Sequence, residues 1–213
     1  MRYEFIKQQH SERLTLLFAG WAMSAKDFDF LSVMEDDLLV CSDYRVLEFD
    51  ESHLTSYVNV RLIGYSMGVW AASFLLRNRN IPFSERIAIN GTMFPVDDKK
   101  GIPIPIYEGT KNGLTEESLQ KFYRRMCGSR NEGIHFLQNT ETKNIRYLQQ
   151  ELAVLFEASK ASDAPTFDWD SVIISTNDYI FPTLNQRQAW QQNSSVRLVE
   201  APHFSQELFK QIV

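Results

Sequence analysis

The sequence lacks the long apolar runs, leader segment and cysteine framework that mark membrane and secreted proteins. Its 213 residues contain no stretch near the ~18 consecutive apolar residues that a bilayer-spanning helix requires. The first residues, Met-Arg-Tyr-Glu-Phe, lack the apolar core of a signal peptide. The two cysteines, Cys41 and Cys127, form neither a disulfide framework nor a Cys-x-x-Cys pair. We therefore expect a cytoplasmic protein in a reducing compartment.

Several signatures of ligand-binding proteins are also missing. No group of His, Cys or carboxylate residues has the spacing of a metal site. The glycine-containing stretch at residues 64–68 lacks the lysine of a phosphate-binding loop. A net charge of −5 argues against a general nucleic-acid-binding protein. We expect a monomer with one domain over residues 1–213, using no metal or cofactor and binding neither nucleic acid nor membrane.

The chain does contain an alternation of short apolar runs and helical segments, which is typical of an α/β protein with a mostly parallel sheet. Apolar runs predict strands at residues 3–6, 14–18, 60–63, 86–91, 172–175 and 196–199. Two further runs lie at 38–41 and 46–49, and we favour the second as a strand because polar turn residues follow it. Helices are predicted after Ser24, after residue 66, from Pro182 to about 191, and over 206–213.

The alternation stops between residues 95 and 160. Prolines and glycines in the stretch 95–109 predict a loop. Two amphipathic helices follow. Thr115 caps the first, and the second carries apolar residues at helical spacing over 145–156. Two consecutive helices inserted in an α/β alternation predict a helical lid over residues 110–160, at the carboxyl-terminal edge of the sheet.

The segment Gly-Tyr-Ser-Met-Gly at residues 64–68 lies where a predicted strand meets a predicted helix. The pattern G-x-S-x-G at such a turn is that of a nucleophile elbow, which exposes the hydroxyl of its serine, here Ser66. Glycine on both sides lets strand and helix approach closely. Because so short a pattern also occurs by chance, its interpretation depends on a base, an acid and oxyanion donors in the right chain order.

Candidates for the base and the acid follow two later strands. A serine nucleophile needs a base and a third group that orients the base, and α/β hydrolases carry them in the order Ser, Asp or Glu, His. Asp178 follows the strand 172–175 and His203 follows the strand 196–199, at the sheet edge where such sites form. His135, the alternative base, precedes Asp178 and lies in the predicted lid. The alternative interpretation of Asp178 and His203 is an ordinary turn aspartate and a surface histidine.

Backbone N–H groups are the expected oxyanion donors. One normally comes from the residue after the nucleophile, which is Met67, and the other from the loop after an early strand. Trp21 follows the strand 14–18 and is the candidate for the second N–H. The alternative is a plain turn with a core tryptophan.

The predicted lid carries a run of positive charge. Residues 119–130 contain no acidic residue and four basic ones: Lys121, Arg124, Arg125 and Arg130. Basic residues near the end of a helix offset its dipole, so one interpretation is a solvated helix face. The other is a docking site for an acidic partner beside the mouth of the active site.

Particular stretches carry a resemblance to a known family. They are Phe-Ala-Gly-Trp-Ala-Met at 18–23, Gly-Tyr-Ser-Met-Gly-Val-Trp at 64–70, Phe-Tyr-Arg-Arg-Met-Cys at 122–127 and Asn-Asp-Tyr-Ile-Phe-Pro at 177–182. Over nearly its whole length the chain resembles the short α/β-hydrolases of bacterial biotin synthesis, the compact pimeloyl-acyl-carrier-protein methyl ester esterases. One departure from common hydrolases is Ala19, where many have histidine. It leaves the chemistry intact because backbone N–H groups do that work.

The resemblance implies an α/β-hydrolase fold and hydrolysis of the methyl ester of pimeloyl-acyl carrier protein, giving pimeloyl-acyl carrier protein and methanol. By analogy the triad is Ser66, Asp178 and His203, with the oxyanion held by Trp21 and Met67. Arg124 and Arg125, with Lys121 and Arg130 beside them, would meet the acidic carrier protein. The alternatives are another acyl esterase or a thioesterase of the same fold, and a non-catalytic acyl-binding module.

Overall fold

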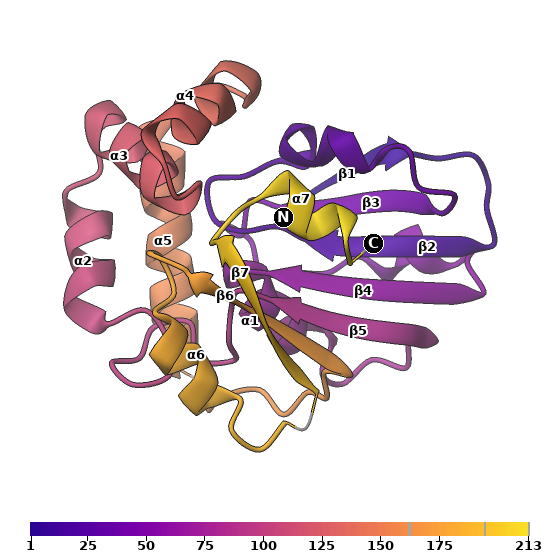
Figure 1. The fold of residues 1–213 in the computed structure, drawn as a ribbon. Coiled ribbons are helices and arrows are strands. Elements are labelled where there is room, and N and C mark those ends of the chain that lie inside the picture. The colour runs from indigo at the N-terminus through magenta and orange to yellow at the C-terminus, as the bar shows by residue number, and fades with distance from the viewer. Residues whose placement is uncertain (162, 194, 213) are drawn as a thin grey trace.

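The computed structural model of the chain describes residues 1–161, 163–193 and 195–212. Within them one sheet of seven strands has the order β1-β3-β2-β4-β5-β6-β7, as Figure 1 shows. Neighbouring strands run parallel, except that the edge strand β1 is antiparallel to β3. The predicted α/β architecture with a mostly parallel sheet is confirmed.

The strands in the middle of the sheet form where short runs of the sequence are mostly apolar, because the inner strands of a parallel sheet are covered on both faces. Their bounds are β1 (Arg2–Lys7), β2 (Arg13–Phe18), β3 (Asp37–Ser42), β4 (Asn59–Tyr65), β5 (Phe83–Ile89), β6 (Ser171–Asn177) and β7 (Val196–Pro202). The preference for residues 46–49 over 38–41 was wrong. Residues 38–41 belong to the fully buried β3, whereas 46–49 are irregular and Val46 is exposed.

Helices cover both faces of the sheet. In Figure 1, α1 (Met67–Leu76) lies behind it, and the 3-10 helix η1 (Ala25–Leu31) and α7 (Gln206–Lys210) lie in front. A second 3-10 helix, η2 (Glu51–Leu54), precedes β4, and α6 (Thr183–Ala189) follows Pro182. The last helix, predicted over 206–213, is shorter than expected, since α7 ends at Lys210. Val213 lies outside the described residues. No helix in the described part of the chain is both long and apolar enough to cross a bilayer.

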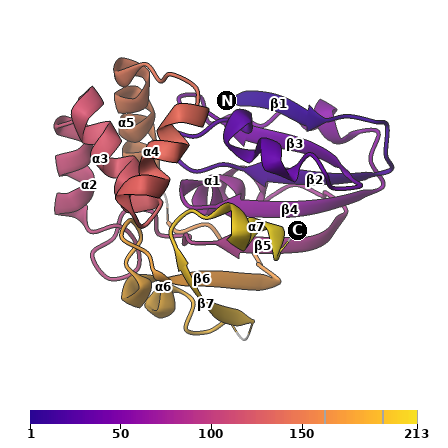
Figure 2. The ribbon, with the colours of Figure 1, turned by 45° about the horizontal axis from the view of Figure 1, so that its top comes forward.

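A group of helices, here called the helical insertion, separates β5 from β6. It consists of α2 (Ile104–Asn112), α3 (Glu116–Met126), α4 (Arg130–Asn139) and α5 (Ile145–Ala161). Figures 1 and 2 show these helices beyond the carboxyl ends of the parallel strands.

The sequence predicted α3 and α5 but not α2 and α4. As predicted, Thr115 caps α3 by accepting the Ser118 N–H. Part of the stretch expected to be a loop is instead α2, which begins after Pro103 and has Pro105 in its first turn, where a proline is tolerated. Helix α4 buries only Gly133 and Phe136. With so few buried positions, its sequence lacks the repeated apolar spacing by which an amphipathic helix is predicted.

Candidate active site

Ser66 lies at a strained turn between β4 and α1. Its φ of 56° and ψ of −124° are unusual for a residue with a side chain. The turn is close-packed as well as strained. A Cβ atom at Gly68 would lie 2.1 Å from the Phe18 carbonyl oxygen, and one at Gly64 would lie 2.9 Å from the Cα of Val69. The glycines on both sides of Ser66 therefore permit the close approach of strand and helix that the sequence predicted.

The structure brings together the side chains of Ser66, His203 and Asp178, which are far apart in the sequence. The Ser66 Oγ lies 3.0 Å from His203 Nε2, and His203 Nδ1 lies 2.8 Å from Asp178 Oδ2. All three residues are buried. Since an ionised carboxylate can only accept, Nδ1 carries the proton and Nε2 is free to accept from the serine hydroxyl. This arrangement can move a proton from Ser66 to His203.

Further donors hold the Asp178 carboxylate in place. Its Oδ1 accepts the backbone N–H groups of Ile180 and Phe181 at 2.8 and 2.9 Å, and its Oδ2 accepts Gln186 Nε2 at 2.9 Å. Gln186 lies on α6 and is fully buried. Sequence reasoning missed it because nothing in the pattern of α6 distinguishes an inward-facing glutamine from an exposed one.

The Asn90 side chain forms hydrogen bonds to β6, which precedes Asp178, and to His203, which follows β7. Its Nδ2 donates to the His203 carbonyl at 2.7 Å and to Ser175 Oγ at 2.8 Å. Its Oδ1 accepts the Ser175 N–H at 2.7 Å, which ties β6 to the end of β5. Sequence reasoning missed this role as well, although a polar residue directly after a buried strand was an available signal.

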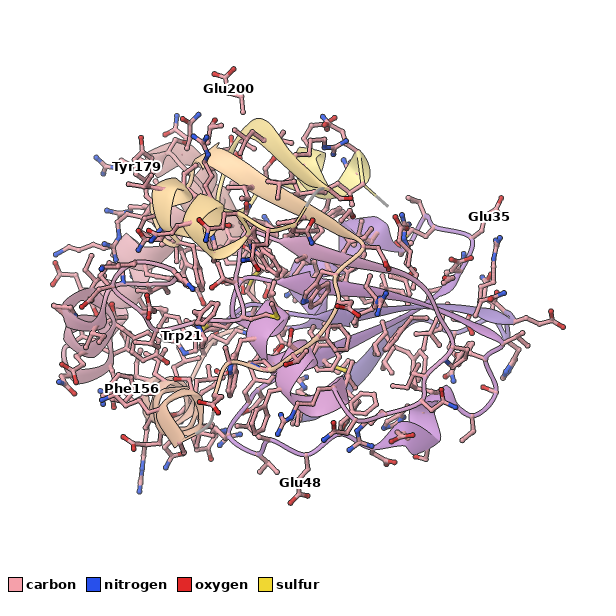
Figure 3. All side chains as sticks on the ribbon, turned by 90° about the horizontal axis from the view of Figure 1, so that it is seen from below. Trp21, Glu35, Glu48, Phe156, Tyr179 and Glu200 are labelled. Carbon is pink, nitrogen blue, oxygen red and sulfur yellow. The ribbon has the colours of Figure 1, made fainter. Side chains whose placement is uncertain are left out.

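The two candidate oxyanion donors line the same cleft as Ser66. Met67 is the first residue of α1, where an N–H has no partner within the helix. Trp21 follows β2, and among the described residues no acceptor pairs with its N–H. Figure 3 shows Trp21 between the helical insertion and the sheet. Both N–H groups are therefore available for a new anionic acceptor.

The cleft above Ser66 is narrow, about 40 Å³, and mostly apolar. Its other lining residues include Ile102, Ile106, Tyr107, Phe122, Leu152 and Ile180. A larger groove of about 850 Å³ shares Tyr179 with the cleft but does not reach Ser66. Tyr179 is exposed, near α6 in Figure 3. An ester would have to enter this apolar cleft to reach the Ser66 hydroxyl, because the larger groove does not extend to it.

The basic run predicted from the sequence is divided between two helices. Arg125 is exposed on α3 and lines the cleft. Arg124 lies where α3 meets α4, since a Cβ at Gly133 would fall 2.6 Å from its Cα. Lys121 is exposed and paired with Glu117 at 2.7 Å, and Arg130 is exposed at the start of α4. Arg125 is therefore the basic side chain next to the site.

Other reactive residue types stay apart from this site. His135 is exposed on α4 and lines the outer groove. Both cysteines are buried and free, and burial raises the pKa of Cys127 to about 12, so neither is an activated thiolate. Across the described ranges, no three His, Cys, Asp or Glu residues are grouped as a metal site requires.

Comparison with known proteins places the chain in a family. A family model described as "Pimeloyl-ACP methyl esterase BioG" matches residues 1–212. The chain belongs to the BioG family. A crystal structure of BioG from Haemophilus influenzae is 34% identical to it with a TM-score of 0.88, and the alignment covers 98% of this chain and 96% of that one. The family resemblance predicted from the sequence motifs is therefore confirmed.

Two further proteins are similar to this BioG family member, one in its fold and one in part of its sequence. The esterase EaEST from Exiguobacterium antarcticum has a TM-score of 0.68 at 16% identity over 98% of this chain and 91% of that one, which agrees with an α/β-hydrolase fold. A Bacteroides fragilis protein named malonyl-[acyl-carrier protein] O-methyltransferase is 41% identical over 197 residues. That match covers 92% of this chain but 40% of the relative, so the chain spans less than half of its length.

Proposed function

We propose that the chain is a serine carboxylesterase that hydrolyses the methyl ester of pimeloyl-acyl carrier protein in biotin synthesis. The observation that carries this proposal is the run of hydrogen bonds from Ser66 Oγ through His203 to Asp178 at an apolar cleft. A hydroxyl becomes a nucleophile near neutral pH when an oriented imidazole can take its proton.

The first half-reaction transfers the acyl group to the enzyme. His203 Nε2 takes the Ser66 proton as Oγ attacks the ester carbonyl, and the carbonyl oxygen becomes an oxyanion. The N–H groups of Trp21 and Met67 donate to that oxyanion. When the intermediate collapses, the C–O bond to the methoxy group breaks, and His203 returns its proton so that methanol leaves. Asp178 stabilises the imidazolium between these transfers.

The second half-reaction uses the same groups on water. His203 takes a proton from a water molecule, the hydroxide attacks the acyl-Ser66 carbonyl, and the same N–H groups hold the second oxyanion. Collapse breaks the bond to Oγ, and His203 returns the proton to Ser66. The product is the free carboxylic acid at the end of an acyl chain that is still attached to its carrier.

Acyl carrier protein is the proposed partner. The description of the family names a pimeloyl-ACP ester, and the Bacteroides relative is named for methylation of a malonyl-acyl carrier protein. Arg125 at the cleft gives an acidic carrier an electrostatic contact, with Arg124, Lys121 and Arg130 contributing on the same helices. In this proposal residues 110–160 act as a cap on a single domain over 1–213, and the carrier docks against it.

Covalent labelling tests the serine mechanism directly. A fluorophosphonate should label wild-type protein at Ser66, and short-chain methyl esters should be hydrolysed. Ser66→Ala should abolish both while the variant unfolds as wild type does. Wild-type turnover by Ser66→Ala would contradict the mechanism. A folded wild-type protein that neither reacts with the probe nor cleaves esters would favour a non-catalytic acyl-binding module.

A further inference from the structure

The turn that carries Trp21 holds a conformation that its sequence does not favour. Met23 N–H donates to the Gly20 carbonyl at 3.3 Å, which closes a four-residue turn. Ala22 in that turn has φ of 64°, in the left-handed region that favours glycine. The Trp21 N–H belongs to the same turn, so its direction depends on the turn keeping this shape.

Buried hydrogen bonds join this turn to the helical insertion. The Tyr123 hydroxyl, on α3, donates to the Ala22 carbonyl at 2.9 Å. The Trp21 indole Nε1 donates to the Leu148 carbonyl on α5 at 3.1 Å. The turn that follows β2 is thus held from two helices of the insertion, through hydrogen bonds that join residues 101 and 127 positions apart in the chain.

The Tyr123 hydroxyl is fixed in position and remains a donor. The residue is almost fully buried, and its ring packs against those of Phe136 and Phe122 at centroid distances of 4.9 and 5.8 Å. Burial raises the pKa of Tyr123 well above its ordinary value, so the hydroxyl keeps its proton at every working pH. A rigid donor can hold the Ala22 carbonyl where a mobile side chain could not.

We propose that Tyr123 is a positioning residue, whose hydrogen bond to Ala22 keeps the Trp21 N–H directed at the oxyanion. This inference rests on the proposed function. It makes the helical insertion part of the catalytic geometry as well as a cover, because a hydroxyl on α3 holds a turn at the edge of the sheet. Tyr123 touches no reacting atom and acts through the backbone of residues 21 and 22.

The test removes the hydroxyl alone, with Tyr123→Phe. We expect kcat on a short p-nitrophenyl ester to fall about 10- to 100-fold while KM changes less than about three-fold, since oxyanion donors act mainly in the transition state. The affinity for a boronic acid, whose tetrahedral adduct with Ser66 carries the oxyanion, should fall in parallel.

Tyr57→Phe is the matched control. Tyr57 is also buried, and its hydroxyl donates to Asp37 Oδ2 at 2.9 Å, at the start of β3 and the opposite edge of the sheet. This variant loses a buried hydroxyl and should lose stability, yet its kcat and boronate affinity should match wild type. The control separates a general loss of packing from a loss of positioning.

A second background tests the strain at Ala22. Glycine adopts the left-handed conformation readily, so the turn should depend less on Tyr123 when residue 22 has no side chain. We expect Tyr123→Phe to reduce kcat less in the Ala22→Gly background than in wild type. An equal reduction in both backgrounds would contradict a role in holding the turn.

Failure of the inference can be told apart from failure of the proposed function. If wild-type protein hydrolyses esters and is labelled at Ser66, but Tyr123→Phe keeps wild-type kcat and boronate affinity, only the inference is overturned. If wild-type protein neither hydrolyses esters nor reacts with a fluorophosphonate, the proposed function fails and the inference falls with it.

Discussion

The side-chain amide of Gln186 donates to Asp178 Oδ2, the same oxygen that accepts the Nδ1–H of His203. The second oxygen of the carboxylate accepts backbone N–H groups, so the carboxylate cannot turn away from the imidazole without losing hydrogen bonds. In the proposed mechanism Asp178 orients His203, and Gln186 in turn fixes Asp178. Gln186 is therefore a fourth residue, beyond the three of the predicted triad, that helps to set the orientation of the His203 ring.

Gln186→Leu should slow the chemical step. The change removes the donor to Asp178 and keeps a side chain of similar length, so we expect kcat to fall roughly 10-fold, the effect of about 1.4 kcal/mol, with little change in KM. Steady-state kinetics on a small ester measures both constants. Gln188→Leu makes the same substitution at an exposed position on α6 and should leave kcat unchanged. Equal kcat in all three proteins would show that Gln186 has no such role.

Glu151 predicts a pH dependence of stability. This carboxyl on α5 is buried, accepts the Tyr44 N–H at 3.0 Å, and has its pKa raised to about 7 from 4.5, chiefly by burial. The folded state therefore holds the proton more tightly than the unfolded state, and this contribution to stability is present below pH 4.5 and lost as pH rises through about 7.

Glu151→Gln should remove that dependence. We expect the unfolding free energy of wild type to decline between about pH 5 and 7 relative to the variant, by up to about 3 kcal/mol. Urea unfolding at a series of pH values measures the difference. Glutamine keeps an acceptor for the Tyr44 N–H, so the comparison isolates the charge. Parallel pH curves for the two proteins would rule out the proposed titration of Glu151.

Charge reversal tests the docking proposal. Arg125→Glu places a negative charge at the cleft, so we expect KM for a carrier-bound ester to rise about 10-fold at low salt, with a smaller effect on a small ester and a weaker effect at high salt. Arg124→Glu should act in the same direction. Arg197→Glu changes the net charge equally near the start of β7, far from the cleft, and should leave KM unchanged. If Arg125→Glu and Arg197→Glu behave alike, carrier docking does not use Arg125.

Sequence reasoning succeeded where the signal is local. The elbow around Ser66, and the placing of Asp178 and His203 after strands, follow from patterns of a few residues at the edge of a parallel sheet. It failed where partners lie far apart in the chain. The bond of Asn90 to His203 joins residues 113 apart, and that of Tyr123 to Ala22 joins residues 101 apart.

The errors in secondary structure have related causes. Residues 38–41 and 46–49 are both short and apolar, and only pairing with β1 and β2 decides between them. The loop expected over 95–109 ends early, and α2 begins within it. Pro105 does not prevent this, because it lies in the first turn of the helix, where a backbone N–H would have no acceptor within the helix. The choice between the two apolar runs is not visible without the tertiary contacts, whereas a proline at the start of a helix was an available local signal.

Intact mass spectrometry of acyl carrier protein loaded with methyl pimelate tests the central claim most directly. After incubation with the wild-type protein, the carrier should lose only the methyl group and keep its acyl thioester, and Ser66→Ala should leave the substrate unchanged. Release of the bare carrier would instead indicate a thioesterase. Recovery of intact methyl ester with active, folded wild-type protein would contradict the proposed reaction.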